Sequence, residues 1–159
     1  MSGFAAWLHA TAFSQTIQAV SWIVPLLQSI HILMIGIVFV SSLMISLRVL
    51  GRVHADEPFE AVWHRFAPWM RIALAVMLVT GLLLVAGEPG REFGSTSFWL
   101  KMALLLVAFA VTRQLGRSPE GPRARPAAIG VILLWIAIIF LGRAIAYDVE
   151  VWRSLSIHA

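Results

Sequence analysis

The chain has 159 residues, of which 60% are hydrophobic and 13% are charged, and its mean hydropathy is +0.86. A soluble domain has about 45–50% apolar and about 25% charged residues, so both values indicate a membrane protein. The absence of cysteine excludes disulfides, iron–sulfur clusters, thiolate metal sites and cysteine nucleophiles. The net charge of +4 does not predict nucleic-acid binding, because the arginines lie between apolar runs, where they orient a protein in a membrane.

The first 22 residues come before any run that is long enough to span a membrane. Phe13, Ile17 and Val20 share one stripe of a helix in this segment. We interpret residues 1–22 as a short amphipathic helix that lies on the membrane surface and joins the first span at Pro25. No positively charged region precedes it and no convincing cleavage site follows, so it does not resemble a secretory signal peptide. A tail that orders only with a partner is the alternative.

Four apolar stretches are long enough to cross the bilayer, which takes about 20 residues for about 30 Å of hydrocarbon. They lie at about 23–47, 69–87, 98–115 and 127–147. The runs are continuous rather than alternating, which favours helices over a closed barrel. We therefore predict one all-α domain over residues 1–159, an integral membrane four-helix bundle.

Charged or turn-forming residues separate the four spans. A solvated loop is expected from Arg48 to Arg65, with Pro68 just before the second span. A turn is expected at 88–90, and the segment 118–126 contains three prolines and reads as a loop.

The distribution of Lys and Arg predicts the orientation of the spans. One side of the membrane receives eight of these residues and the other side receives four. We therefore expect the loops after the first and third spans in the cytoplasm and both termini outside. The eight are Arg48, Arg52, Arg65, Arg71, Arg113, Arg117, Arg123 and Arg125.

Ionisable side chains at membrane depth are costly and are functional candidates by default. His31 lies about 12 Å into the first span at 1.5 Å per residue. Gln28 and Met34 lie one turn before and after it on the same face. Lys101 follows the start of the third span, and Arg143 precedes the end of the fourth. The topology therefore gathers these residues in the outer half of one bundle.

A neutral imidazole with two cations nearby fits a haem site. The Nε2 atom of His31 would bind iron, while a neighbouring acceptor would hold Nδ1. Lys101 and Arg143 would pair with the two haem propionates through charge-assisted hydrogen bonds. These residues predict haem b as the cofactor.

The second axial ligand of such a haem is less defined. His9, on the N-terminal segment, could fold over the outer end of the bundle. Met34 and Met102 are weaker candidates. His54 and His64 belong to the loop at the other end, about 25 Å away along the helix at 1.5 Å per residue.

Simpler roles remain open for the same residues. His31 alone could hydrogen-bond a neighbouring helix or relay protons, and Lys101 and Arg143 could extend to the interface as long cationic side chains do. Copper is a third option, but the methionines are scattered and no M-x-x-M or H-x-M motif is present.

Pairs of small residues within the spans predict close helix packing. Thr80 and Gly81 in the second span could instead give room to a flat cofactor. The pairs are Gly36 with Ser42, Thr80 with Gly81, and Gly142 with Ala146.

Five short segments resemble an uncharacterised family of small bacterial four-helix membrane proteins. The resemblance covers roughly residues 13–115. The segments are Trp22–Pro25, Gln28–His31, Leu47–Gly51, Leu78–Leu84 and Phe98–Met102. It implies a location in the bacterial inner membrane.

More distantly, the chain is similar to the haem-binding membrane protoporphyrinogen oxidase and to the membrane domain of the copper-resistance protein D family. The oxidase resemblance places His31 and Lys101 at matching positions, with Arg48 as a loose match. The copper-resistance family shares the histidine of the first helix and the lysine of the third. The sequence lacks the aromatic, proline and histidine cluster that follows the first helix of the oxidase, so the resemblance implies the haem-binding scaffold more than the oxidase activity.

These observations predict a b-type haem membrane protein. Its role would be electron transfer with a quinone or a partner dehydrogenase, or haem-dependent oxidation near the outer face. A copper-handling or small-molecule transport protein is one alternative, and a non-catalytic membrane anchor or assembly subunit is another. A homo-oligomer is a further expectation, because four short helices enclose little core.

Overall fold

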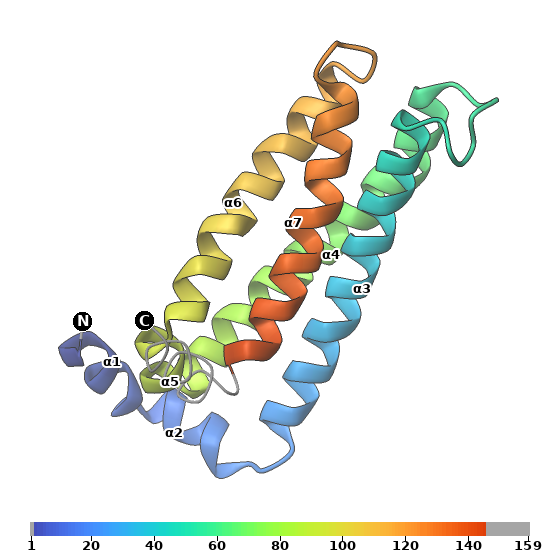
Figure 1. Cartoon of the computed structure of the whole chain (residues 1–159). Coiled ribbons are helices and arrows are strands. Elements are labelled where there is room, and N and C mark those ends of the chain that lie inside the picture. The colour runs from blue at the N-terminus through green and yellow to red at the C-terminus, as the bar shows by residue number, and fades with distance from the viewer. Residues whose placement is uncertain (1, 146–159) are drawn as a thin grey trace, which may run out of the picture.

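The computed structural model describes residues 2–145, and this part of the chain forms seven helices and no strand (Figure 1). The helices are α1 Ser2–His9, α2 Ala12–Ala19, α3 Ile23–Val49, α4 Phe59–Gly87, α5 Pro89–Gly94, α6 Thr96–Arg117 and α7 Ala124–Ala144. The helices α3, α4, α6 and α7 are each long and apolar enough to cross a membrane. The predicted four-helix membrane bundle is therefore confirmed, and the chain is a multi-pass membrane protein.

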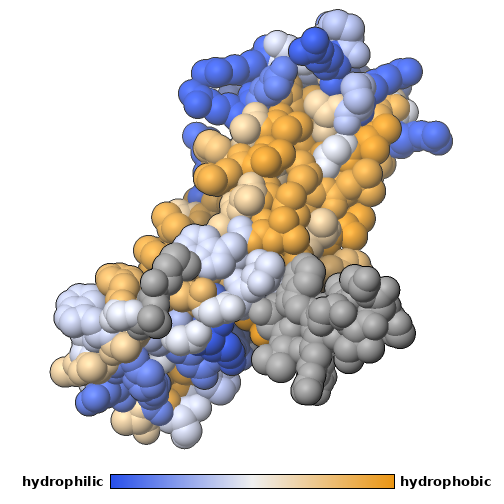
Figure 2. All heavy atoms as spheres, turned by 60° about the vertical axis from the view of Figure 1, so that its left-hand side comes forward, coloured by the Kyte–Doolittle hydropathy of each residue, from blue (hydrophilic) through white to orange (hydrophobic). Residues whose placement is uncertain are grey.

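The four long helices run between two different ends of the molecule (Figure 1). At one end, which we call the arginine-rich end, lie the loops 50–58 and 118–123. At the other, which we call the N-terminal end, lie α1, α2 and α5. Figure 2 shows hydrophilic side chains gathered at the arginine-rich end and an apolar belt directly beside them. This division is the one that a bilayer requires of a spanning protein.

The second long helix, α4, begins at Phe59 rather than near Trp69, so half of the predicted loop is helical. Pro68, which we expected just before the helix, lies inside it and removes one backbone hydrogen bond there. Packing explains the difference, because the buried stripe of α4 starts at its first residue with helical spacing. The stripe comprises Phe59, Val62, Ala67, Met70, Ala73 and Met77.

Two shorter segments also differ in detail from the prediction. The turn expected at 88–90 opens α5, because Pro89 takes a position in the first turn where its missing N–H costs nothing. The amphipathic segment before the first span forms two helices rather than one. Thr11 begins the second of them by accepting a hydrogen bond from the backbone N–H of Ser14 at 3.3 Å. Both pack on the bundle, α1 against α5 and α2 against α4.

The apolar core runs from the arginine-rich end into the middle of the bundle. In it α3 packs on α4, and α7 packs on both α3 and α6. Its buried members are Val38, Ile45, Phe59, Met70, Ala73, Met77, Ala108, Leu115, Ala124, Ala128, Val131, Trp135 and Ile138. The buried residues of α3 all lie between Val38 and Ser46. The first half of α3, which carries His31, therefore adds no fully buried side chain.

Small residues permit close packing at some of the predicted places. Ser42 is buried, and its hydroxyl donates to Met70 Sδ at 3.4 Å across the α3–α4 contact. The prediction for Gly36 is wrong, because nothing lies within 4 Å of the position that a Cβ would take there. A contact that the sequence did not reveal lies at Gly116, where a Cβ would be 2.4 Å from Trp63 Cη2. The indole of Trp63 therefore rests directly on the backbone of α6.

Candidate functional site

The imidazole of His31 joins α3 to α4 through a hydrogen bond with Thr80. The atoms His31 Nδ1 and Thr80 Oγ1 are 2.8 Å apart. The same hydroxyl donates to the backbone carbonyl of Val76 at 2.9 Å. A threonine hydroxyl has one hydrogen, so when it donates to Val76 it must accept from His31. In that arrangement the proton lies on Nδ1, and Nε2 keeps an unprotonated lone pair.

Gly81 gives the imidazole its place against α4. A Cβ added at Gly81 would lie 3.2 Å from His31 Cε1 and 3.8 Å from Nδ1. Any side chain larger than hydrogen would therefore press on the ring. Thr80 and Gly81 are thus explained together, since one holds the ring by a hydrogen bond and the other leaves space for it. The sequence signal was the Thr-Gly pair within an apolar span, although it did not identify His31 as the partner.

Lys101 of α6 lies at the same end of the bundle. It is half-buried, and its Nζ is 3.7 Å from the position that a Cβ would take at Gly142 of α7. The structure therefore brings His31 and Lys101 to the same end of the bundle, with Thr80 of α4 against the imidazole and Gly142 of α7 beside the ammonium group. Ala146, the predicted packing partner of Gly142, lies outside the described residues.

The other predicted site residues are not drawn into direct contact with this imidazole. His9 is exposed at the end of α1, and its Nδ1 is 3.4 Å from Gln18 Nε2 of α2. Met34 packs against the apolar core. Gln28 is half-buried one turn before the histidine on α3, and Arg143 is exposed in the last turn of α7. Of the two predicted cations, the lysine is half-buried and the arginine is exposed.

In this region one side chain, the imidazole of His31, is a candidate ligand for a metal ion. Within residues 2–145, no three His, Asp or Glu side chains come together in a group that could hold a metal ion. The described residues therefore lend no support to a copper site of several side chains. A haem needs only one or two protein ligands, because the porphyrin supplies the other four.

The comparisons with known proteins give one match. A model of a family of unknown function, designated DUF6644, matches residues 8–148. The search of curated proteins found no match, and neither did the search of solved structures. An uncharacterised family is what the sequence resemblance indicated, whereas the more distant resemblances to haem and copper proteins are not reproduced. Because the match covers most of its length, the chain belongs to this family of unknown function.

Proposed function

We propose that this chain is a membrane-bound b-type haem protein with His31 as an axial ligand through Nε2. The observation that supports it is the hydrogen bond from Nδ1 to Thr80. A ligating histidine almost always donates its other ring N–H to a fixed acceptor, which sets the tautomer and orients the ring. Thr80 would take that role when its own hydrogen is directed to Val76.

The surrounding residues fit this group. Gly81 keeps the ring against α4, and the half-buried Lys101 supplies a cation for a propionate. Arg143, in the last turn of α7, would serve the second propionate by extending from the helix surface. A bound haem supplies one-electron redox chemistry at its iron. We propose that the protein uses it for electron transfer with a quinone or a redox partner protein, or for haem-dependent oxidation.

We expect one protein ligand from the described residues. His54 and His64 lie at the arginine-rich end of the bundle, and the hydrogen bond of His9 is to Gln18. The proposal includes a bacterial inner-membrane location with both termini outside. It also includes self-association of the bundle, because four short helices enclose little core.

A structural role is the second candidate, and the same hydrogen bond favours it. A polar pair that ties two helices together in lipid contributes about 0.6–2 kcal/mol. His31 and Thr80 would then be a packing contact in a membrane anchor or assembly subunit. This alternative needs no cofactor and predicts that the purified protein carries none.

The test is the visible absorption spectrum of the protein purified in mild detergent from haem-replete cells, oxidised and then reduced with dithionite. We expect a Soret band in the wild type and in His64→Ala, the control for an exposed histidine at the other end. His31→Ala should lose the band while it elutes normally in size-exclusion chromatography. Full haem content in His31→Ala would overturn the ligand assignment. A wild type without a Soret band would favour the anchor role.

A further inference from the structure

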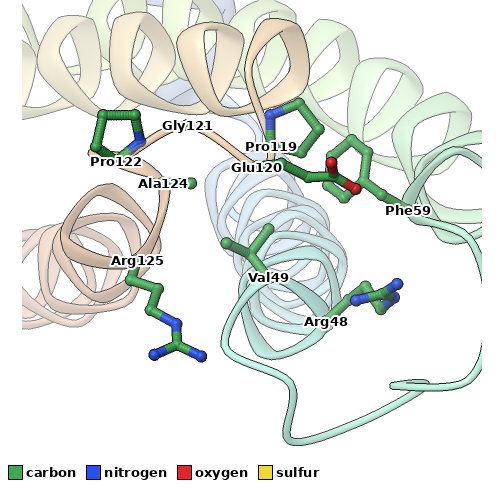
Figure 3. Close-up of a pocket in the computed structure, with 9 residues that line it drawn as sticks. All are labelled: Arg48, Val49, Phe59, Pro119, Glu120, Gly121, Pro122, Ala124 and Arg125. Carbon is green, nitrogen blue, oxygen red and sulfur yellow. The ribbon is translucent and has the colours of Figure 1, made fainter.

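A second polar site lies at the arginine-rich end and does not depend on haem binding. A pocket of about 310 Å³ opens between the end of α3, the start of α4 and the loop that joins α6 to α7 (Figure 3). A volume of this size holds a small-molecule group. The lining residues are Arg48, Val49, Phe59, Pro119, Glu120, Gly121, Pro122, Ala124 and Arg125.

Two arginines from different helices dominate the charge of this pocket. In the view of Figure 3, the guanidinium groups of Arg48 and Arg125 lie on either side of Val49, and the carboxylate of Glu120 lies near Phe59. Arg48 is anchored, because its Nε donates to the backbone carbonyl of Glu57 at 2.6 Å. That bond occupies one nitrogen and leaves the two terminal nitrogens of the fork for a ligand.

The lining arginines are not neutralised by ion pairs with the described residues. Four such pairs occur within residues 2–145, and none includes Arg48 or Arg125. The two sequence segments 48–71 and 113–125 carry eight arginines against four acidic residues, which accounts for the entire net charge of +4. The pocket therefore presents an unbalanced positive charge with Glu120 as its one acidic lining residue.

The chemistry of the pocket suits a phosphate group. Guanidinium forks bind phosphate oxygens through paired, charge-assisted hydrogen bonds. Pro119 and Pro122 lie in the lining of the pocket. They limit the backbone conformations of this loop, because each proline fixes its own φ angle. The arginine-rich end borders the apolar belt of the bundle (Figure 2), so the pocket lies at the level of lipid headgroups. Basic pockets between membrane helices are known to take anionic headgroups at this level.

We propose that this pocket binds the phosphate of an anionic phospholipid headgroup, held between Arg48 and Arg125. The experiment titrates dimyristoyl phosphatidylglycerol into the protein in dodecyl maltoside and follows the thermal unfolding midpoint by tryptophan fluorescence. Binding to the folded state raises this midpoint with concentration, which yields an apparent Kd. Dimyristoyl phosphatidylcholine is the neutral lipid, and inorganic phosphate is the soluble source of the same group.

Two double variants with the same loss of charge separate the pocket from the general charge of this end. R48Q/R125Q removes both lining arginines, and R52Q/R113Q removes two exposed arginines outside the lining. We expect the apparent Kd for phosphatidylglycerol to rise at least about tenfold in R48Q/R125Q, as expected for lost charge-assisted bonds, and to stay near the wild-type value in R52Q/R113Q. Should R48Q/R125Q not fold, R125Q against R113Q makes the same comparison.

Three results would count against the proposal. Equal weakening in both double variants would mean diffuse attraction to charge, and no weakening in R48Q/R125Q would mean binding elsewhere. A midpoint shift by inorganic phosphate as large as that by phosphatidylglycerol would assign the pocket to a soluble phosphate instead of a lipid. A preference for phosphatidylglycerol over phosphatidylcholine that disappears only in R48Q/R125Q would support it.

Discussion

The two halves of α3 differ in what they contribute to the bundle. From Val38 to Ser46 the helix carries five buried residues, three of which are serines, and one of these, Ser42, contacts Met70 of α4. From Ile23 to Ile37 none of its residues is fully buried. In this first half the contact with α4 includes a hydrogen bond of the His31 imidazole.

If His31 is the proposed ligand, this contrast separates stability from function within one helix. In lipid, helices associate through close packing rather than through the exclusion of water, so the half with tight contacts holds the fold. The half with a polar, partly accessible side chain carries the proposed haem ligand His31. The following predictions test that division, starting with the largest expected effect.

Trp135→Ala is expected to be the most destabilising change, at about 3–5 kcal/mol in the free energy of unfolding. Trp135 is 3% exposed within the core, so truncation leaves a cavity where α7 packs on α3 and α6. The measurement is unfolding by SDS titration from dodecyl maltoside. Phe140→Ala on the same helix is the control, because Phe140 is 71% exposed. Equal losses at both positions would refute a core at this place.

Trp135→Phe sharpens the same test. The indole Nε1 is buried and has no hydrogen-bond partner among the described residues. An unpaired buried donor costs about 1–3 kcal/mol, which offsets the contacts that the smaller ring loses. We therefore expect Trp135→Phe to change the stability by less than about 1 kcal/mol. A loss as large as that of Trp135→Ala would mean that the N–H is bound by a partner.

Gly116→Leu should cost about 1–3 kcal/mol, as overpacking of a close contact does. Its side chain would enter the space of Trp63, whose ring lies 2.4 Å from the Cβ position. Gly36→Leu is the matched control, since Gly36 has open space around it in the half of α3 outside the core. We expect that variant to be neutral or slightly stabilised, because leucine is the better helix former. The two are compared by the same SDS titration.

Thr80→Val tests the polar half and should cost about 1 kcal/mol by loss of the bond to His31. Thr112→Val, at another buried threonine, should have a smaller effect because no bond to a histidine is lost there. If haem is bound, only Thr80→Val should also lower its affinity, by about 10–100-fold. The affinity is measured by mixing the protein with apomyoglobin and following the transfer of haem through the change in the Soret band. A Thr80→Val protein that matches wild type in both readouts would leave this half of α3 without a defined role.

The fold was predictable to the extent that hydrophobicity determines it. Long apolar runs in a membrane have few structural solutions, so the number of spans and their approximate ends follow from the sequence. The start of α4 was missed because Pro68 and the nearby charged residues are typical of a loop that ends just before a span. The buried stripe that begins at Phe59 nevertheless keeps this segment helical. Such a stripe is recognised from the sequence only when the helical spacing of apolar residues is considered together with the composition.

The candidate site was predictable by residue type but not by partner. His31 and Lys101 stand out because ionisable groups are rare at membrane depth, and topology alone brings them to one end. Their contacts depend on how each helix is rotated about its axis, which the near-uniform apolar pattern of α3 leaves undetermined. Thr80 and Gly81 therefore emerged as neighbours of His31 only from the structure.

The smallest expected effect concerns charges at the arginine-rich end, outside the core. Glu57 accepts from Arg65 Nη2 and contacts His54 Nδ1, each at 2.7 Å. The hydrogen bonds from Arg65 and His54 lower the pKa of this carboxyl below its usual 4.5. A lowered pKa in the folded state adds stability above 4.5 that disappears as the pH falls through the lowered value. Glu57→Gln should therefore unfold at a slightly lower temperature than wild type at neutral pH, and the difference should close in acid. Glu60→Gln, at an exposed position in the first turn of α4, is the control. An effect of Glu57→Gln as large as that of Gly116→Leu would mean that this charge cluster, and not only the apolar core, holds the arginine-rich half together.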